Sequence, residues 1–582
     1  MLNKKYFILV DLVLAVSLLL AACQPAATAP AATQAPANTA VPAAATSAPA
    51  PTVPAAATSV PVPTVPAATS APAPTTAPAL ADKLTVGLWS TFDNLDPNAT
   101  TFTLVGGITM HIAETLLWES KPGVFEPNLA TTWSSNADAT EYTFKLRQGV
   151  MFSDGTPFNA QAVKFTFDRI VDPATKSQTA FSLIGPYKET DIVDDYDIVI
   201  KFTSPYAPFF DSVAQPQMGI VSPTAYAKAG AANWGITTLV GTGPYLLSSY
   251  TPNSEVVLER NDKYWGGVRT EYTGLARIKT IDYKIITEPS SRFASLQTGE
   301  TQFIEYVPEE DFDQLKSDPN FATAEMVQPG SGQDLMMNVK NPPLDDLQVR
   351  LAVEYGVNKA GMIQSVWSGF GKPGCSILTS AIFGFDPNSC NLYPYNVDKA
   401  KQILDADGWV DNGSGVRQKN GKPLTLGFYF QSNNNMSTLE AQYFQSDMAK
   451  IGIQVTLNGL ANAGYFDAVR SGKHHFQLWN ETATDPDVVR ILLYSTNAGG
   501  GTNRNNYVNP AMDKLIDQAA GTTDQAQRLQ FYAQIQKMVE DQAIMVNFED
   551  PELLYANTSK LNGVIYYSGG NYYNFYAATL QK

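Results

Sequence analysis

Cysteine and histidine, which often act as nucleophiles or metal ligands, are scarce in this 582-residue chain. The three histidines are His111, His474 and His475, and the three cysteines are Cys23, Cys375 and Cys390. Adjacent histidines do not converge on one ion without further ligands, and no CxxC or Cys/His cluster is present. The patterns HExxH, GxSxG before a helix and a Cys–His nucleophile are also missing. The sequence therefore predicts no metal site, no cofactor and no enzyme, and a secreted hydrolase is the least favoured class.

Cys23 directly follows a short apolar signal. Two lysines precede an apolar run from Tyr6 to Leu20, and small residues precede the cysteine, as in a cleaved export signal. The run is too short for a comfortable membrane span, and Asp11 interrupts it. The string LAA at 20–22 resembles a bacterial lipobox, which implies a lipoprotein signal peptide at 1–22 and acylation of Cys23. The alternative is an ordinary secretory signal with an incidental cysteine.

The segment after the signal carries no charge. From Gln24 to Ala81 there is no charged and no aromatic residue, and Val-Pro-Ala-Ala recurs at Val41, Val53 and Val65. Such a segment has almost nothing to bury against the entropy of folding. We therefore expect 23–82 to be a disordered Pro/Ala/Thr tether that holds a soluble body outside a membrane.

The body from Lys83 to Lys582 has about 500 residues, which is too many for one core and predicts two or three domains. It has no apolar stretch of membrane-spanning length. The chain's formal net charge of −16 argues against nucleic acid as a partner, because phosphate binding needs clustered Lys and Arg.

Cys375 and Cys390 are the pair that remains if Cys23 is acylated. In an oxidising exterior, an isolated pair with a short loop between its members favours a disulfide. The loop-entropy model gives such a bridge about 3 kcal/mol of stabilisation. Two separate thiols are the alternative.

Strand and helix patterns alternate along the body, which predicts an α/β fold. Half-buried strands are expected at 142–146, 198–202 and 453–457, and amphipathic helices at 163–170 and 529–539. Ser437 and Glu440 form a capping box that predicts the start of a helix, and Gly452 is placed to end it.

The most specific string is LRQGVMFSDGTPFNAQAVKFTFDR at 146–169, which predicts a strand, a tight turn at Asp154-Gly155 and a helix capped by Asn159. Further strings stand in a matching order at 95–97, 128–133, 241–245, 261–267, 349–363, 396–409, 506–519 and 524–543. From about Leu84 to the C-terminus, the chain resembles family 5 of the extracytoplasmic solute-binding proteins of peptide-type ABC transporters. That group contains oligopeptide-, dipeptide- and nickel-binding receptors.

The resemblance implies an α/β, periplasmic-binding-protein-like fold of type II, with two lobes, an additional domain on lobe I and a cleft between the lobes. Carried onto this sequence, lobe I takes 83–117, 205–330 and 557–582, the additional domain 118–204, and lobe II 331–556. The chain would then cross between the lobes near Gly330 and near Ala556.

In peptide-binding relatives, a carboxylate four residues before a proline of lobe II holds the ligand's α-amino group. The matching proline here is Pro486, and four residues before it stands Thr482. A neutral hydroxyl cannot form the charge-assisted hydrogen bond that an ammonium group requires. Glu481 or Asp485 could substitute, so either a shifted carboxylate binds a peptide or the ligand is not a peptide.

The same alignment brings two aromatic residues to the cleft. Trp479 would line its wall, where a ring stacks on a sugar face or a peptide side chain, and core packing is its alternative. Phe548 stands where relatives have an aromatic residue near the hinge, although Val546 occupies a position commonly held by proline. The predicted ligand-binding residues are Trp479, Glu481, Thr482, Asp485 and Phe548.

The function implied by the resemblance is a lipid-anchored receptor without catalysis. It would capture a short peptide or similar solute and deliver it to the permease of an ABC importer. Contacts that exist only when both lobes engage the ligand would drive their closure. We expect a monomer in the cell envelope, on the outer face of the cell membrane. An oligosaccharide-binding receptor and a tethered sensor without transport are the alternatives.

Overall fold

The structure is a computed structural model that describes residues 79–582, except 101, 269–271, 391 and 568–571. The predicted signal peptide and the acylated Cys23 lie outside the described residues, as does the tether up to residue 78. Within the described ranges, no helix has the length and apolar character needed to cross a membrane.

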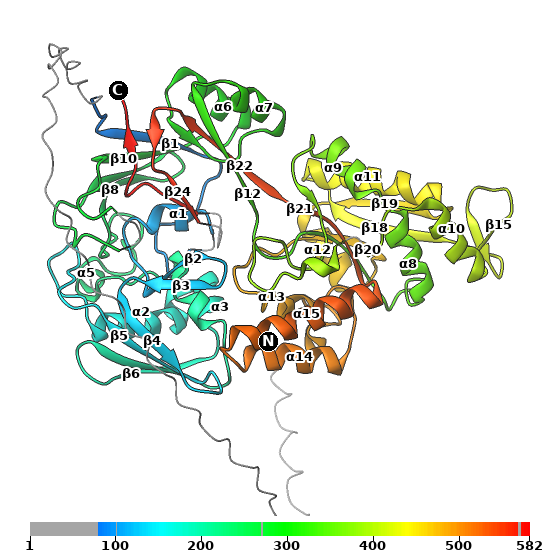
Figure 1. The fold of residues 1–582 in the computed structure, drawn as a ribbon, viewed down its shortest axis with the longest axis horizontal. Coiled ribbons are helices and arrows are strands. Elements are labelled where there is room, and N and C mark those ends of the chain that lie inside the picture. The colour runs from blue at the N-terminus through cyan, green and yellow to red at the C-terminus, as the bar shows by residue number, and fades with distance from the viewer. Residues whose placement is uncertain (1–78, 101, 269–271, 391, 568–571) are drawn as a thin grey trace, which may run out of the picture. The chain divides into compact units, whose positions relative to one another are not determined.

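A mixed seven-stranded sheet is the centre of one part of the described chain (Figure 1). We call this sheet, its helices and the C-terminal strands the first unit. In spatial order its strands are β12 (Phe321–Val327), β22 (Glu552–Thr558), β11 (Phe303–Ile304), β1 (Lys83–Leu88), β10 (Thr280–Ile285), β9 (Glu255–Arg260) and β8 (Tyr245–Thr251). Both β10 and β11 run parallel to β1, which is buried from its second residue onward. The accompanying helices are α1 (Val105–Thr109), α5 (Pro223–Ala229), α6 (Pro289–Thr298) and α7 (Glu309–Ser317).

The last residues of the described chain return to this first unit. They form two short antiparallel strand pairs: β23 (Leu561–Asn562) pairs with β26 (Thr579–Leu580), and between these in the sequence β24 (Ile565–Tyr567) pairs with β25 (Tyr572–Asn574). Tyr573 and Phe575 join Leu84 and Val86 in one buried apolar cluster, so the C-terminal segment completes the core that the first strand begins.

An antiparallel four-stranded sheet has its own apolar core. Its strands are, in order, β4 (Ala130–Ser135), β5 (Glu141–Leu146), β7 (Asp197–Phe202) and β6 (Tyr187–Ile192). The hairpin of β2 (Leu117–Lys121) and β3 (Val124–Pro127) lies near it. The nearby helices are α2 (Ala160–Val171), α3 (Thr179–Ile184) and α4 (Phe209–Ser212). Phe144, Phe167 and Phe209 are fully buried together. The strands predicted at 142–146 and 198–202 and the helix at 163–170 are confirmed, and Asn159 caps α2 by accepting from two backbone N–H groups.

The second unit is built on a six-stranded sheet. Its strands are, in order, β14 (Lys372–Pro373), β21 (Met545–Asp550), β13 (Gln333–Met337), β20 (Phe476–Trp479), β18 (Thr425–Gln431) and β19 (Gln454–Leu460). Its helices are α8 (Leu347–Gly356), α9 (Lys359–Val366), α10 (Val397–Ala406), α11 (Asn435–Lys450), α12 (Asn462–Arg470), α13 (Val488–Leu493), α14 (Pro510–Ala520) and α15 (Gln525–Gln542). A separate small sheet consists of β15 (Val410–Asp411), β16 (Arg417–Lys419) and β17 (Lys422–Pro423). The strand predicted at 453–457 and the helix at 529–539 are confirmed in β19 and α15.

Helix α11 begins earlier than the capping box predicts. Asn434 is its N-cap, because its side chain accepts from the N–H groups of Met436 and Ser437. Ser437 therefore lies inside the first turn, and Glu440 is fully buried and accepts from Gln333 Nε2 at 3.0 Å. The asparagine three residues upstream satisfies the free N–H groups, so the predicted serine cap is wrong.

The chain passes between the seven- and six-stranded sheets twice. The first passage is the segment 328–332 between β12 and β13, and the second is Pro551 between β21 and β22. Gly330 has φ +121°, and a Cβ there would lie 2.1 Å from the carbonyl oxygen of Glu481, so this passage requires glycine. The second change of sheet comes a few residues before Ala556, where sequence analysis had set the lobe boundary.

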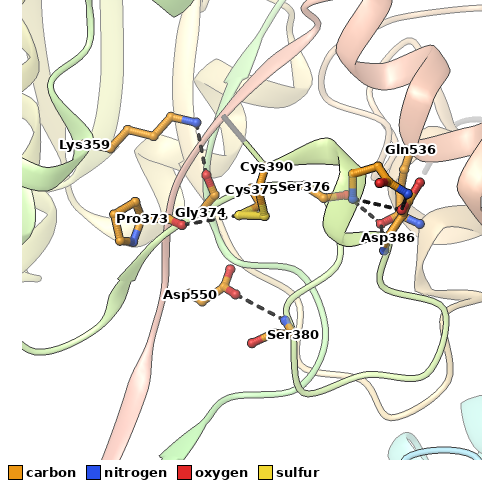
Figure 2. Close-up of a disulfide and its surroundings, with 11 residues drawn as sticks. Lys359, Pro373, Gly374, Cys375, Ser376, Ser380, Asp386, Cys390, Gln536 and Asp550 are labelled. Atoms are coloured by element: carbon orange, nitrogen blue, oxygen red, sulfur yellow. Dashed lines mark hydrogen bonds between the residues drawn. A yellow bond between two sulfur atoms is a disulfide. The ribbon is translucent and has the colours of Figure 1, made fainter. Parts of the chain in front are cut away.

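Cys375 and Cys390 are joined by a disulfide in the structure, with Cα atoms 4.4 Å apart (Figure 2). The loop that it closes is also held at both ends by one buried side chain of α15. Ser376 Oγ donates to Gln536 Oε1 at 2.8 Å, and Asp386 N donates to the same oxygen at 3.0 Å. The bridge and Gln536 therefore hold the same loop to the second unit.

Candidate ligand-binding site

The loop 480–487, between β20 and α13, is fixed to the first passage between the sheets. Glu481 N donates to Ser331 Oγ at 2.8 Å, and Ser331 N donates back to Glu481 O at 2.9 Å. Gln328 Nε2 donates to Thr482 Oγ1 at 2.7 Å. A movement of this passage would therefore be transmitted to the loop.

A cavity of about 510 Å³ lies beside the loop. One part of its wall comes from the second unit and includes Glu481, Thr482, Thr484, Asp485, Asp487 and Arg490. The other part follows the four-stranded sheet and the C-terminal hairpin and includes Tyr206, Asp211, Gln215, Gln217 and Tyr572. The volume lies within the range of sites for small organic ligands, and the polar side chains on both walls can orient a ligand.

Glu481 is one of the carboxylate residues that line this cavity. Its Oε2 accepts from Trp479 Nε1 at 3.0 Å. Burial raises the pKa of Glu481, while the Trp479 hydrogen bond and the positive charge of Arg504 act against that rise. Glu481 is thus a carboxylate on the cavity wall that is positioned by an indole and is not paired with a cation at hydrogen-bond distance among the described residues.

Trp479 is half-buried and is not among the described residues that line the cavity. The guanidinium carbon of Arg504 lies 3.6 Å from the ring centroid, and Phe466 meets the ring edge-on with centroids 6.0 Å apart. Arg504 and Phe466 therefore pack against the ring, and its N–H positions Glu481, while contact of the ring with a ligand stays a prediction.

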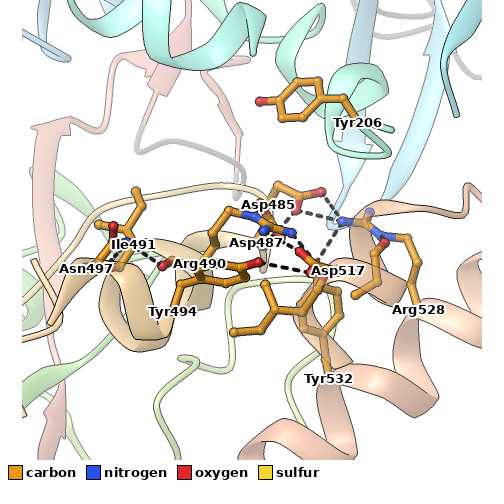
Figure 3. A network of polar contacts seen from close by, with 12 residues as sticks. Tyr206, Asp485, Asp487, Arg490, Ile491, Tyr494, Asn497, Asp517, Arg528 and Tyr532 are labelled. Carbon is orange, nitrogen blue, oxygen red and sulfur yellow. Dashed lines mark hydrogen bonds and ion pairs between the residues drawn. The ribbon is translucent and has the colours of Figure 1, made fainter. Parts of the chain in front are cut away.

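Asp485 lines the cavity but already has a partner. Figure 3 shows its carboxylate facing Arg528 of α15, whose Nη2 lies 2.7 and 2.9 Å from the two carboxylate oxygens. Both side chains are nearly buried, and against the lowering effect of burial the charge of Asp485 raises the pKa of Arg528 well above its usual range. Asp485 therefore anchors the loop to α15 and is not a free partner for a ligand ammonium.

Asp487 and Arg490 extend this polar network (Figure 3). Arg490 Nε donates to Asp487 Oδ2 at 3.0 Å, and its Nη1 donates to Asp517 Oδ1 at 2.8 Å. Burial raises the pKa of Asp487 to about 6, against the effect of Arg490. Arg490 is therefore engaged with two carboxylates at the edge of the cavity.

Asp211, on the opposite wall, was not found by sequence analysis. It is only 4% exposed, and its Oδ2 accepts from Thr484 Oγ1 while its Oδ1 accepts from Gln215 Nε2 at 3.4 Å. Burial, and then the negative charge of Asp485, raise the pKa of Asp211 to about 7. The string FFDS around Asp211 matches no local motif, so its position at the cavity could be found only from the fold.

Phe548 lies on β21 and is fully buried. Its ring packs on Phe444 with centroids 5.9 Å apart, in the apolar cluster beneath the six-stranded sheet. The predicted ligand contact is therefore corrected: Phe548 is a core residue, because its strand position turns the ring toward α11. Thr482, by contrast, is exposed and lines the cavity.

The histidines have structural partners. His474 is buried, its Nε2 lies 2.9 Å from the carbonyl oxygen of Arg504, and burial lowers its pKa to about 4. His475 Nδ1 accepts from Gly427 N at 3.0 Å. Within the described ranges, no three side chains of His, Cys, Asp or Glu are grouped so that they could hold a metal ion.

Comparison with known proteins identifies a family and several relatives. Residues 124–503 match the family described as bacterial extracellular solute-binding proteins, family 5 Middle. The glutathione-binding protein GsiB of Escherichia coli (strain K12) is 27% identical over 496 residues, which cover 83% of this chain and 92% of that protein. The probable D,D-dipeptide-binding periplasmic protein DdpA of the same strain is 28% identical over 447 residues, covering 76% of this chain and 82% of the relative.

Solved structures share the fold. NikA from Brucella suis, in complex with Fe(III)-EDTA, superposes with a TM-score of 0.75 at 23% identity. The match covers 86% of this chain and all of NikA, 100%. The likeness confirms the predicted two-lobed α/β fold.

Proposed function

Because the chain belongs to the bacterial extracellular solute-binding proteins of family 5, we propose that it captures a short peptide in the 510 Å³ cavity. The protein is a substrate-binding component of an ABC importer and not an enzyme. The captured peptide would be delivered to the importer's permease in the membrane.

The cavity wall is the observation that carries this proposal. Glu481 and Arg490 reach it from the second unit, whereas Asp211 and Tyr572 reach it from elements outside that unit. A ligand that contacts both groups of side chains stabilises the arrangement in which they face each other. Closure around a ligand is the signal that a receptor of this kind gives to a permease.

The peptide class is favoured by the carboxylate on the wall and by the relatives. Glu481 is available for an ammonium group, since the side-chain hydrogen bond that its carboxylate accepts among the described residues comes from a neutral indole. GsiB and DdpA are named for glutathione and for D,D-dipeptides. We therefore infer that Glu481, and not Asp485 or Thr482, holds the α-amino group of the peptide.

The experiment begins with the native ligand. Protein purified without refolding is denatured, and mass spectrometry of the supernatant identifies what it carried. Peptides of that composition are then titrated by calorimetry, each beside its N-acetylated form. Glu481→Gln should weaken binding of the free peptide by about tenfold or more and leave the N-acetylated form almost unchanged, because a charge-assisted hydrogen bond is lost only with the former.

Glu310→Gln is the matched control, because Glu310 is an exposed residue of α7 that does not line the cavity. It should leave both affinities unchanged. Equal loss for the free and acetylated peptides would contradict the role of Glu481. An oligosaccharide in the supernatant, with no peptide binding, would replace the peptide class by a neutral sugar.

We further propose that the receptor is a monomer tethered to the outer face of the cell membrane through lipid on Cys23. The string LAA before Cys23 and the uncharged segment from Gln24 to Ala81 support this location. A tether lets the receptor exchange ligand outside the cell and stay near its permease. Nucleic acid is not a proposed partner, because the net charge is −16.

A further inference from the structure

A second, much smaller cavity adjoins the ligand cavity. It has a volume of about 20 Å³ and is lined by Met110, Thr115, Trp118, Glu119 and Tyr567, among others. Gln215 and Tyr572 line both cavities, so the two spaces meet at these side chains. A space of this size holds one water-sized group.

Glu119 brings a carboxylate into this small space. It lies on β2 and is 8% exposed. Its Oε1 accepts from Gly123 N at 2.6 Å, but its buried Oε2 has no hydrogen-bond partner in the part of the chain that the structure describes. A buried polar atom without a partner is costly, so a donor belongs beside this oxygen.

Asp211 stands next to the same junction from the side of the larger cavity. Gln215, which lines both spaces, donates to Asp211 Oδ1 at 3.4 Å. Burial, and then the negative charge of Asp211, raise the pKa of the Glu119 carboxyl well above its usual value. A cation between them would relieve both the burial cost and the repulsion.

The described residues on the two walls supply one cation, Arg490. It is engaged with Asp487 and Asp517 at 3.0 and 2.8 Å. A cation beside Glu119 would therefore come from a molecule that enters the cavity. A primary ammonium is compact enough for a water-sized space, whereas a planar guanidinium is larger.

We propose that the ligand carries a primary ammonium group on a flexible chain, as a lysine side chain does, and that this group binds between Asp211 and Glu119 where the two cavities meet. This subsite rests on the proposed function, since the rest of the peptide would occupy the larger cavity. It lies on the opposite wall from Glu481, so one peptide can engage both.

The subsite is tested first with a simple amine and the full chain. Pentylamine is titrated at about pH 8 by calorimetry and by thermal melting, with tetramethylammonium as a cation too large for the space. Pentylamine should raise the melting temperature, and Glu119→Gln should weaken its binding by about tenfold or more. Glu126→Gln on the paired strand β3 is the control and should bind like the parent.

Glu119→Gln should melt no lower than the parent, because it removes a buried repulsive carboxyl. If this variant does not fold, Asp211→Asn serves in its place and should show the same loss. No response to pentylamine in the parent, or an unchanged response in the variants, would overturn the subsite. A response of equal size to tetramethylammonium would also overturn it.

A second experiment separates the subsite from the peptide proposal. Tripeptides that contain lysine are compared with the same peptides carrying norleucine, which has the chain without the ammonium group. The parent should bind lysine peptides at least about tenfold more tightly, and Glu119→Gln should abolish the difference. Peptide binding without this preference would overturn the subsite alone. A pentylamine response without any peptide binding would support the subsite and overturn the peptide function.

Discussion

At the scale of single residues, Trp479 is expected to act through its neighbours. Its ring is covered by Arg504 and Phe466, and its N–H positions Glu481. A fully buried aromatic ring costs about 3 to 5 kcal/mol when truncated to alanine, and a half-buried one costs less. Trp479→Ala should therefore lower the free energy of unfolding of the ligand-free protein by about 2 kcal/mol, measured by urea denaturation.

Binding by the same variant separates the two roles of Trp479. If the ring only positions Glu481, Trp479→Ala should weaken binding of the free peptide more than that of its N-acetylated form. An unchanged free energy of unfolding together with equal loss of both peptides would instead mean that the indole contacts the ligand.

Asp211 should make the protein less stable as the pH rises. Burial, followed by the charge of Asp485, raises its pKa to about 7, whereas an unfolded aspartate titrates near about 3.9. Between these values the folded state keeps a proton that the unfolded state has released. The stabilisation of the folded state by this retained proton is complete below about pH 4 and is lost as the pH rises through about 7.

Asp211→Asn should accordingly flatten the dependence of the free energy of unfolding on pH between about 4 and 7, by at most about 1.4 kcal/mol per pH unit. The measurement is urea denaturation at a series of pH values. Glu310→Gln, an exposed change, should leave the slope as it is. The same slope in Asp211→Asn and in the parent would show that this carboxyl does not retain its proton.

Single residues also show what sequence can and cannot provide. Glu481, Thr482 and Asp485 were placed near the ligand from their position before Pro486, and all three line the cavity. Their different roles were not predictable, because the partner of Asp485 is Arg528 on a separate helix. Asp211 lacks any motif and becomes visible only when the fold brings it to the opposite wall.

At the scale of elements, local sequence signals are sufficient to predict a helix and its cap where these depend only on neighbouring residues. Asn159 and the helix that it caps were predicted because both depend on a few adjacent side chains. The start of α11 was misplaced, since Asn434 and Ser437 both have cap chemistry and sequence does not rank them. Glu440 was taken for a cap residue but is buried against Gln333 of β13.

The loop 480–487 depends on α15 through one ion pair. Asp485 and Arg528 are 11% and 7% exposed at their side chains, and breaking such a pair leaves an uncompensated charge. Asp485→Asn should lower the free energy of unfolding by about 3 kcal/mol, and the double variant with Arg528→Met should regain part of this loss. A stable Asp485→Asn protein that binds peptide weakly would instead assign Asp485 to the ligand.

The loop closed by Cys375 and Cys390 gives a second test at this scale. The two cysteines are 15 positions apart, and a bridge of that length contributes about 3 kcal/mol in the loop-entropy model. Unreduced, denatured Cys23→Ser protein made under oxidising conditions should contain essentially no free thiol, and a reductant should lower its melting temperature. Two reactive thiols before reduction would rule out the bridge.

At the scale of the whole molecule, the order of the strands along the sequence differs from their order in the sheets. The seven-stranded sheet takes strands from both ends of the described chain, β1 and β22, and no local pattern predicts that pairing. The resemblance of whole strings to a family supplied the two-lobed architecture. The change of sheet falls at Pro551, between β21 and β22, a few residues before the boundary at Ala556 that the resemblance implies.

The proposed placement of the receptor at a membrane would depend on Cys23. In a lipoprotein the thiol of this residue receives lipid before the signal is removed, so a hydroxyl in its place blocks both steps. The Cys23→Ser precursor should keep its signal peptide and incorporate no labelled fatty acid, which gel mobility and labelling in cells measure. Its body should still bind peptide, because Cys23 lies far along the sequence from the residues that line the cavity. A Cys23→Ser protein that is matured and remains bound to membranes through lipid would show that the anchor lies elsewhere.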